Sequence, residues 1–155
     1  MAGFGIAELE AGGGRLGLCP MPGRSGDYAG DLAVLLRWRP AMVVTMATSD
    51  ELANHGAAGL AGDFRAAGIG WRHLPVADFA AQSVALMLDW RRVSAEAQGH
   101  LSEAGGVLFH CLGGCGRSGM AVMRLLVELG EAPEAALARL RVVRPCAVET
   151  GTQRD

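Results

Sequence analysis

The feature that most constrains this chain is the sequence VLFHCLGGCGRSG, which covers residues 107–119. It begins with a short apolar run typical of a buried strand, and Gly113, Gly114 and Gly116 follow within a few residues. An apolar segment with helical spacing comes next, so the sequence predicts a strand, a tight loop and a helix in direct succession. Such a loop places several backbone N–H groups at a helix N-terminus, an arrangement that binds phosphate groups.

A cysteine and an arginine give this loop its chemistry. Five residues separate Cys111 from Arg117, and a serine follows the arginine, so the pattern is His-Cys-x5-Arg-Ser. The planar guanidinium of Arg117 matches two phosphate oxygens at once, which a lysine ammonium would not do. The same N–H groups and the helix dipole also stabilise a thiolate on Cys111, which is the nucleophilic form of cysteine.

The neighbouring loop residues have expected supporting roles. Ser118 can donate a hydrogen bond to the Cys111 sulfur, and His110 is expected to order the loop through hydrogen bonds to the backbone rather than to act as a base. The predicted phosphate-binding residues are Leu112, Gly113, Gly114, Cys115, Gly116 and Arg117. Two other interpretations stay open. Cys111 could be a buried structural cysteine. His110, Cys111 and Cys115 could instead bind zinc, although the rest of the sequence contains no second pair of residues with the spacing of zinc ligands.

An acid is also needed on a separate loop, because an alkoxide or phenolate leaving group must gain a proton. Asp78 is the candidate: it follows an apolar-rich strand that ends at Pro75 and lies thirty-three positions before Cys111, enough for one helix to return the chain. The same carboxylate could then activate the hydrolytic water. Asp78 could instead only cap the next helix, and Asp63 and Asp89 are competitors, although both lie in segments predicted to be helical.

Four segments spread along the chain carry a family resemblance: residues 16–24 (LGLCPMPGR), 73–78 (HLPVAD), 110–118 (the central loop) and 144–150 (RPCAVET). With these segments the chain resembles the protein tyrosine phosphatase superfamily, in its small dual-specificity branch and among its kinase-associated phosphatase-like members. The resemblance covers most of the chain, and the central loop is its most specific part.

The resemblance implies a role for each matching residue. Cys111 would be the nucleophile that forms a phosphocysteine intermediate, Arg117 would bind the phosphate, Asp78 would be the general acid, and the Ser118 hydroxyl would assist release of the thiolate. It further implies a cysteine phosphatase fold and a reaction that needs no cofactor and no metal. Arg24 could contact the substrate or a flanking loop, and an ordinary surface position is an equal alternative.

Cys115 departs from the family pattern, in which an apolar residue commonly stands at this loop position. Its sulfur could form a reversible disulfide with Cys111 after peroxide exposure, or Cys115 could be only a small apolar filler. Cys19 and Cys146 are interpreted as buried apolar residues of core segments. Because the four cysteines show no pairing pattern, they favour a reducing cytoplasm.

Length and composition favour one compact catalytic domain over residues 1–155, in which 50% of the residues are hydrophobic. A net charge of −2 gives no support for nucleic-acid binding. The first ten residues lack the basic start and apolar run of a signal peptide, and the most apolar helical segment contains Arg124 and Glu128, so we expect no membrane span.

Alternation of strands and helices predicts an α/β fold of three layers, with a mostly parallel central sheet covered by helices on both faces. The predicted strands are residues 15–19, 41–47, 70–76 and 106–111, and the predicted helices are residues 27–38, 50–67 with a possible interruption at 54–56, 80–103, 117–129 and 133–143. The active loop is expected at the carboxyl end of the strand that ends at Cys111, where such folds bind ligands.

The loop interior contains no lysine, which phosphoinositide-directed relatives usually carry, so a phosphorylated protein or a small phosphomonoester is the expected substrate. Phe79 could line the pocket or belong to the core, and the resemblance alone implies that Glu149, Thr150 and Gln153 brace the loop or its water. Two other functions stay open: a thiol redox enzyme such as an arsenate reductase using Cys111 and Cys115, and a module that binds phosphoproteins without turnover.

Overall fold

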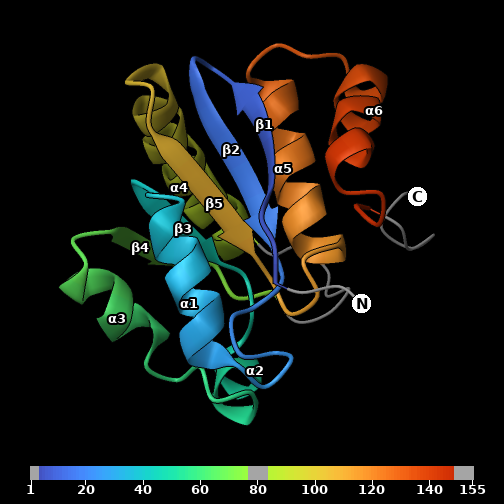
Figure 1. The fold of residues 1–155 in the computed structure, drawn as a ribbon. Helices are drawn as coiled ribbons and strands as arrows, with labels where there is room; N and C mark the ends of the chain where they lie inside the picture. The colour runs from blue at the N-terminus through green and yellow to red at the C-terminus, as the bar shows by residue number, and fades with distance from the viewer. Residues whose placement is uncertain (1–3, 77–83, 149–155) are drawn as a thin grey trace.

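A five-stranded sheet with the strand order β1-β2-β5-β3-β4 forms the centre of the molecule (Figure 1). The computed structural model describes residues 4–76 and 84–148, without the side chains of 84–87. The strands are β1 (Ala7–Ala11), β2 (Gly14–Cys19), β3 (Met42–Thr45), β4 (Gly70–His73) and β5 (Gly106–His110), and the helices are α1 (Tyr28–Arg37), α2 (Ser49–Asn54), α3 (Leu60–Ala66), α4 (Val84–Ser102), α5 (Gly116–Glu128) and α6 (Pro133–Val143).

The middle strand of the sheet, β5, positions the functional loop. It pairs in parallel with β2 on one side and with β3 on the other, and Val107 lies opposite both Leu16 and Met42. Every residue of β5 is buried, as expected for a parallel strand whose two faces are both covered by helices. The strand therefore delivers its carboxyl end, and the loop that follows, at a rigid position in the centre of the sheet.

Helices cover the sheet in two groups, each with its own apolar core (Figure 1). The helices α4, α5 and α6 contact β1, β2, β3 and β5 on one face, and this core includes Phe109 and Leu125. The helices α1 to α3 cover the other face, where Leu35 and Phe64 pack with Leu108 of β5. Consecutive residues of β5 thus point into different cores, which is the alternation that a pleated strand imposes.

The predicted three-layer α/β fold with a mostly parallel sheet is confirmed, with two differences in detail. The sheet gains an additional edge strand, β1, which the sequence interpretation missed and which pairs antiparallel with β2. The predicted helix 50–67 is two helices, α2 and α3, and the break falls at the suspected interruption: α2 ends at Asn54, and Gly56 has a φ of 73°. Among the described residues, no helix is long and apolar enough to cross a membrane.

Candidate active site

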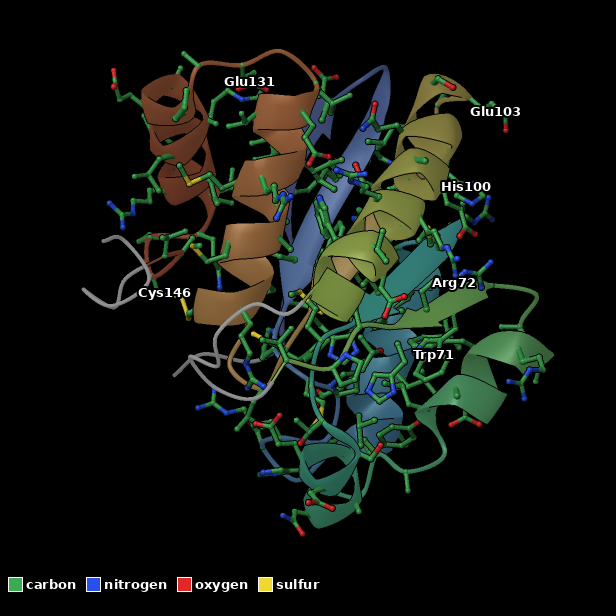
Figure 2. The ribbon with its side chains drawn as sticks, turned by 180° about the vertical axis from the view of Figure 1, so that it is seen from behind. Trp71, Arg72, His100, Glu103, Glu131 and Cys146 are labelled. Carbon is green, nitrogen blue, oxygen red and sulfur yellow. A yellow bond between two sulfur atoms is a disulfide. The ribbon has the colours of Figure 1, made fainter. Side chains whose placement is uncertain are left out.

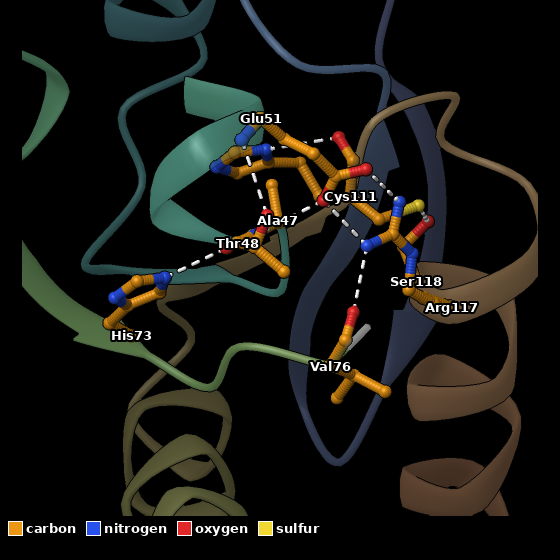
Figure 3. A network of polar contacts seen from close by, with 9 residues as sticks. Ala47, Thr48, Glu51, His73, Val76, Cys111, Arg117 and Ser118 are labelled. Carbon is orange, nitrogen blue, oxygen red and sulfur yellow. Dashed lines mark hydrogen bonds and ion pairs between the residues drawn. The ribbon is translucent and has the colours of Figure 1, made fainter. Parts of the chain in front are cut away.

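Cys111 is the first residue after β5 and lies at the bottom of the loop that leads to α5. Its side chain is buried, and its sulfur lies 3.3 Å from the hydroxyl oxygen of Ser118, which is itself fully buried in the first turn of α5 (Figure 3). The sequence prediction that Ser118 can donate a hydrogen bond to this sulfur therefore agrees with the geometry. The other free cysteine among the described residues is Cys19, at the end of β2.

His110, the last residue of β5, ties the start of the loop to the neighbouring strand β3. Its Nε2 atom lies 2.6 Å from the Thr45 hydroxyl oxygen, and its Nδ1 atom lies 3.4 Å from the carbonyl oxygen of Cys111. Thr45 accepts a hydrogen bond of 2.8 Å from the indole N–H of Trp71, so its own hydroxyl proton is available to His110. Complete burial lowers the pKa of His110 to about 4, and the imidazole is neutral at physiological pH.

The peptide carbonyls of the loop all point into the body of the protein. The carbonyl of Leu112 accepts from the Met21 N–H at 3.1 Å, those of Gly113 and Gly114 accept from the Arg144 guanidinium at 2.9 Å each, and that of Cys115 accepts from the Val148 N–H at 3.3 Å. In a trans peptide the carbonyl and the following N–H point in opposite directions. The N–H groups of residues 113–116 therefore point away from the protein body.

These four N–H groups are available to bind an anion. Within residues 4–76 and 84–148, none of them donates a hydrogen bond to a protein acceptor. Several converging N–H groups at the start of a helix are an arrangement that binds phosphate. Residues outside the loop thus hold its carbonyl groups by hydrogen bonds, and the N–H groups of residues 113–116 remain available for a ligand.

Gly114 is required by close packing as well as by its backbone angles. Its φ is 73°, and a Cβ atom added there would lie 2.5 Å from the carbonyl carbon of Cys19 and from the nitrogen of Pro20. Only glycine fits this position without moving the chain. Gly113 differs, because an added Cβ would meet nothing closer than the Arg24 guanidinium at 3.6 Å.

Arg117, in the first turn of α5, is held by a residue that the sequence interpretation did not identify. Its two terminal nitrogens donate to the two carboxylate oxygens of Glu51 at 2.8 and 2.9 Å, and one of them also donates to the Val76 carbonyl at 2.8 Å (Figure 3). A two-pronged contact of this kind fixes the plane of a guanidinium. Glu51 therefore sets the orientation of Arg117 before any ligand arrives.

Glu51 also belongs to the N-terminal cap of α2. Its Oε1 atom accepts from the Thr48 N–H at 2.9 Å, while its own N–H donates to the Thr48 hydroxyl at 3.2 Å. Hydrogen bonds from Arg117 lower the pKa of the Glu51 carboxyl to about 2, so the carboxylate stays ionised over the working range of most enzymes. The pattern Thr-x-x-Glu before an apolar position was a visible capping signal in the sequence, although it gave no indication of the arginine partner.

Cys115 and Cys146 form a disulfide bond with a Cα–Cα distance of 5.2 Å. The prediction of Cys146 as a buried apolar core residue was therefore wrong, and so were both interpretations of Cys115, as an apolar filler and as a partner for Cys111. The bond links the residue before α5 to the segment after α6, where Figure 2 shows Cys146. Since two of the four cysteines are paired, the cysteines no longer favour a reducing compartment.

A zinc site made of His110, Cys111 and Cys115 is also contradicted. The Cys115 sulfur is bonded to Cys146, and the His110 ring contacts Thr45 and the backbone of Cys111. These three side chains therefore do not converge on a common point where a metal ion could bind them.

Asp78, the predicted acid, lies outside the described residues, and so do Phe79, Glu149, Thr150 and Gln153. Its two competitors are placed elsewhere. Asp63 on α3 accepts a hydrogen bond from the Tyr28 hydroxyl, which connects α1 with α3, and Asp89 is exposed on α4. The described chain nearest to Asp78 ends at Val76, whose carbonyl contacts Arg117.

Comparison with solved structures supports the fold. The kinase associated phosphatase (KAP), solved with serine in place of its catalytic cysteine, is 25% identical and superposes with a TM-score of 0.84 over 99% of this chain and 91% of that one. Tk-PTP in its active form is 28% identical, with a TM-score of 0.72 over 96% and 91%. The human tyrosine phosphatase-like serine/threonine/tyrosine-interacting protein, 19% identical over 96% and 89% with a TM-score of 0.69, shares the fold.

A search of curated protein sequences found no match. A family model, described as the DSP-PTPase phosphatase of polymorphic toxin systems, matches residues 21–131, which is more than two thirds of the chain. This region contains the loop, Glu51 and the strands β3, β4 and β5. The chain therefore belongs to this family of dual-specificity protein tyrosine phosphatases and is a cysteine-based phosphatase.

Proposed function

We propose that this chain removes phosphate from phosphorylated proteins through a phosphocysteine intermediate on Cys111. The Cys111 thiolate attacks phosphorus, the bond from phosphorus to the ester oxygen breaks, and the leaving oxygen takes a proton from Asp78. Water, deprotonated by the Asp78 carboxylate, then attacks the phosphocysteine. The sulfur–phosphorus bond breaks, Ser118 donates a hydrogen bond to the departing thiolate, and inorganic phosphate leaves.

One observation carries this proposal: four backbone N–H groups point away from the protein body around a loop that starts at a buried cysteine sulfur. Such donors neutralise the equatorial oxygens of a phosphoryl group while the sulfur attacks from below. Arg117 adds a fixed guanidinium at the same loop. Leu112, Gly113, Gly114, Cys115 and Gly116 supply backbone, and His110 holds the start of the loop.

The acid role of Asp78 is supported by the chain that leads to it. The Val76 carbonyl contacts the Arg117 guanidinium, and Asp78 is only two residues further along the sequence. Val76, the last described residue before this segment, is thus tied directly to the arginine of the phosphate loop. Neither Asp63 nor Asp89 has a comparable link.

The proposed substrate is a phosphoprotein, because the loop interior between Cys111 and Arg117 contains no lysine for additional phosphates. We treat residues 1–155 as one catalytic domain that acts in the cytoplasm, where ATP-dependent kinases make phosphoproteins. The family description places such phosphatases in polymorphic toxin systems, and we propose that setting for this activity as well. A thiol redox reaction of Cys111 with Cys115 is not favoured, because Cys146 occupies the Cys115 sulfur.

Hydrolysis of a small aryl phosphate in the presence of a chelator tests the mechanism. Cys111→Ser is expected to lose roughly 10⁴-fold or more in kcat, because the nucleophile is removed. Asp78→Asn is expected to lose about 100-fold on esters with poor leaving groups and little on nitrophenyl phosphate, whose leaving group needs less protonation. Full activity of Cys111→Ser would exclude the proposed mechanism, and equal losses on both ester types would remove Asp78 as the acid.

A further inference from the structure

Arg24 is a cation at the edge of the phosphate loop to which the reaction described above assigns no task. A Cβ atom added to Gly113 would lie 3.6 Å from its Nη1 atom and 3.9 Å from its Cζ atom, so the guanidinium lies against this loop residue. The side chain of Arg24 is exposed. Within residues 4–76 and 84–148, its side chain makes no hydrogen bond and no ion pair, unlike those of Arg117 and Arg144.

The turn that carries Arg24 is fixed on two sides. The Met21 N–H donates to the Leu112 carbonyl of the phosphate loop at 3.1 Å, and the Arg24 N–H donates to the Met21 carbonyl at 3.1 Å. On the other side, the Gly23 N–H donates to the buried carboxylate of Asp31 on α1 at 2.9 Å. The backbone of Arg24 therefore holds a constant position relative to the phosphate loop.

Glycine at position 23 is part of the same construction. Its φ is 90°, and an added Cβ would lie 2.6 Å from the His55 carbonyl oxygen. Only glycine permits this tight turn, and a buried carboxylate anchors it. The position of Arg24 is therefore fixed by the fold, unlike that of an arginine on a loosely held surface loop. It brings a cation beside the position where the substrate phosphate binds.

A cavity of about 330 Å³ opens beside this turn, and its lining includes Pro20, Arg24, Ser25, Asp31 and Arg144. Two guanidinium groups and one carboxylate give this wall a formal charge of +1. Asp31 is already engaged by the Gly23 N–H, and Arg144 is engaged by the loop carbonyls. Arg24 is therefore the charged group of this wall that can meet an anion of the substrate.

From this geometry we propose that Arg24 is a specificity residue, which binds a second anionic group of the substrate beside the phosphate that reacts. This inference rests on the proposed function. In a peptide, consecutive Cα atoms are about 3.8 Å apart, so an anionic side chain next to the phosphorylated residue stays close enough for the long Arg24 side chain to meet it. The recognised chemistry is an anion, supplied by a carboxylate or by a second phosphate. A guanidinium accepts either of these with two parallel hydrogen bonds.

The test compares kcat/KM for phosphotyrosine peptides that carry aspartate, phosphoserine or alanine on either side of the phosphotyrosine. Each value is divided by the kcat/KM of the same variant for a small aryl phosphate. We expect the wild type to favour the anionic peptides about tenfold, mainly through KM, and Arg24→Gln to lose this preference. Arg24→Lys should restore part of it. The matched control is Arg65→Gln, the same charge change at an exposed position on α3, which should keep the preference.

Each outcome separates the two proposals. No hydrolysis of the aryl phosphate by wild type overturns the proposed function itself. Hydrolysis without a preference for anionic peptides, or a preference that survives in Arg24→Gln, overturns only the role of Arg24. A preference for phosphoserine but not for aspartate identifies the second phosphate as the ligand, and the reverse identifies a carboxylate. Equal losses in Arg24→Gln and Arg65→Gln would indicate general charge attraction and would also overturn the inference.

Discussion

The two ends of the phosphate loop are held in different ways. At the strand end, Cys111 follows a fully buried strand, and His110 connects it to Thr45 through a neutral hydrogen bond. At the helix end, Cys115 is bonded covalently to Cys146, and Arg144 binds the loop carbonyls. The strand end depends on burial within the sheet, whereas the helix end depends on a segment far along the chain. Cys111, the proposed nucleophile, therefore lies on the part of the loop that burial makes rigid. The N–H groups that we propose bind the phosphate lie on the part that needs support from distant residues.

The largest expected effect comes from the middle of the loop, where both supports meet. In Gly114→Ala the new Cβ would clash with the backbone of Cys19 and Pro20 at a positive φ, so we expect a loss of more than about 3 kcal/mol of unfolding free energy and of nearly all activity. Gly113→Ala, with no backbone clash, should stay within about 1 kcal/mol. Denaturant unfolding of both variants measures this, and equal stability of the two would contradict it.

Removal of the disulfide tests the helix end. Closure of a loop with a sequence separation of 31 residues is worth about 2 to 4 kcal/mol, and the double variant Cys115→Ser/Cys146→Ser should lose this amount. The double variant should keep more activity than Gly114→Ala, because Arg144 still binds the carbonyls of Gly113 and Gly114. Wild type in reductant should match the double variant, while reductant should not change the variant. Four reactive thiols in the unreduced, denatured wild type, instead of those of Cys19 and Cys111 alone, would contradict the bond.

Burial of His110 at the strand end of the loop should make the free energy of unfolding depend on pH. The unfolded chain protonates His110 below its ordinary pKa of 6.5, whereas burial lowers the pKa of the folded imidazole to about 4. Because the unfolded state binds the proton first, stability from this group falls as the pH drops from 6.5 to 4, by about 3 kcal/mol. His110→Gln should flatten this part of the profile of unfolding free energy against pH. An unchanged slope in that variant would show that other groups cause the acid sensitivity.

The smallest of these effects concerns the orientation of Arg117. In Glu51→Gln only the amide oxygen can accept from Arg117, and the NH2 group that replaces the other oxygen faces an N–H donor. We expect kcat/KM for an aryl phosphate to fall about 10- to 100-fold. Asp50→Asn makes the same charge change one position earlier, at an exposed site of α2, and should be close to wild type. If the two variants lose activity equally, the charge of α2 matters and the contact with Arg117 does not.

The sequence was most informative where structure and chemistry are local. The strand β5, the loop and α5 follow each other without interruption, so one continuous pattern predicted the position of Cys111 and Ser118 and the end of the sheet where they lie. β1 was missed, although Gly12 and Gly13, with φ values of 59° and 97°, form the glycine pair typical of a tight hairpin between β1 and β2.

The supports of the loop could not be read from the sequence for a physical reason. Glu51 lies 66 positions from Arg117, Arg144 about 30 positions from the carbonyls that it binds, and Cys146 lies 31 positions from Cys115. Each of these pairs is created by the packing of helices on the sheet, which no local pattern records. The cysteines illustrate this most clearly, because only the folded chain shows which two sulfur atoms meet.

The carboxylate of Glu51 links the activity of the enzyme to the fraying of a short helix. Its Oε1 atom accepts from both the Thr48 N–H and the Arg117 guanidinium, so the first turn of α2 and the orientation of Arg117 depend on the same carboxylate. Any event that unwinds this turn, such as heat or a substitution of Thr48, would also weaken the contact that orients Arg117. A substitution of Thr48, which caps α2 through Glu51, should therefore lower kcat. This short helix should accept fewer substitutions than the exposure of its residues suggests.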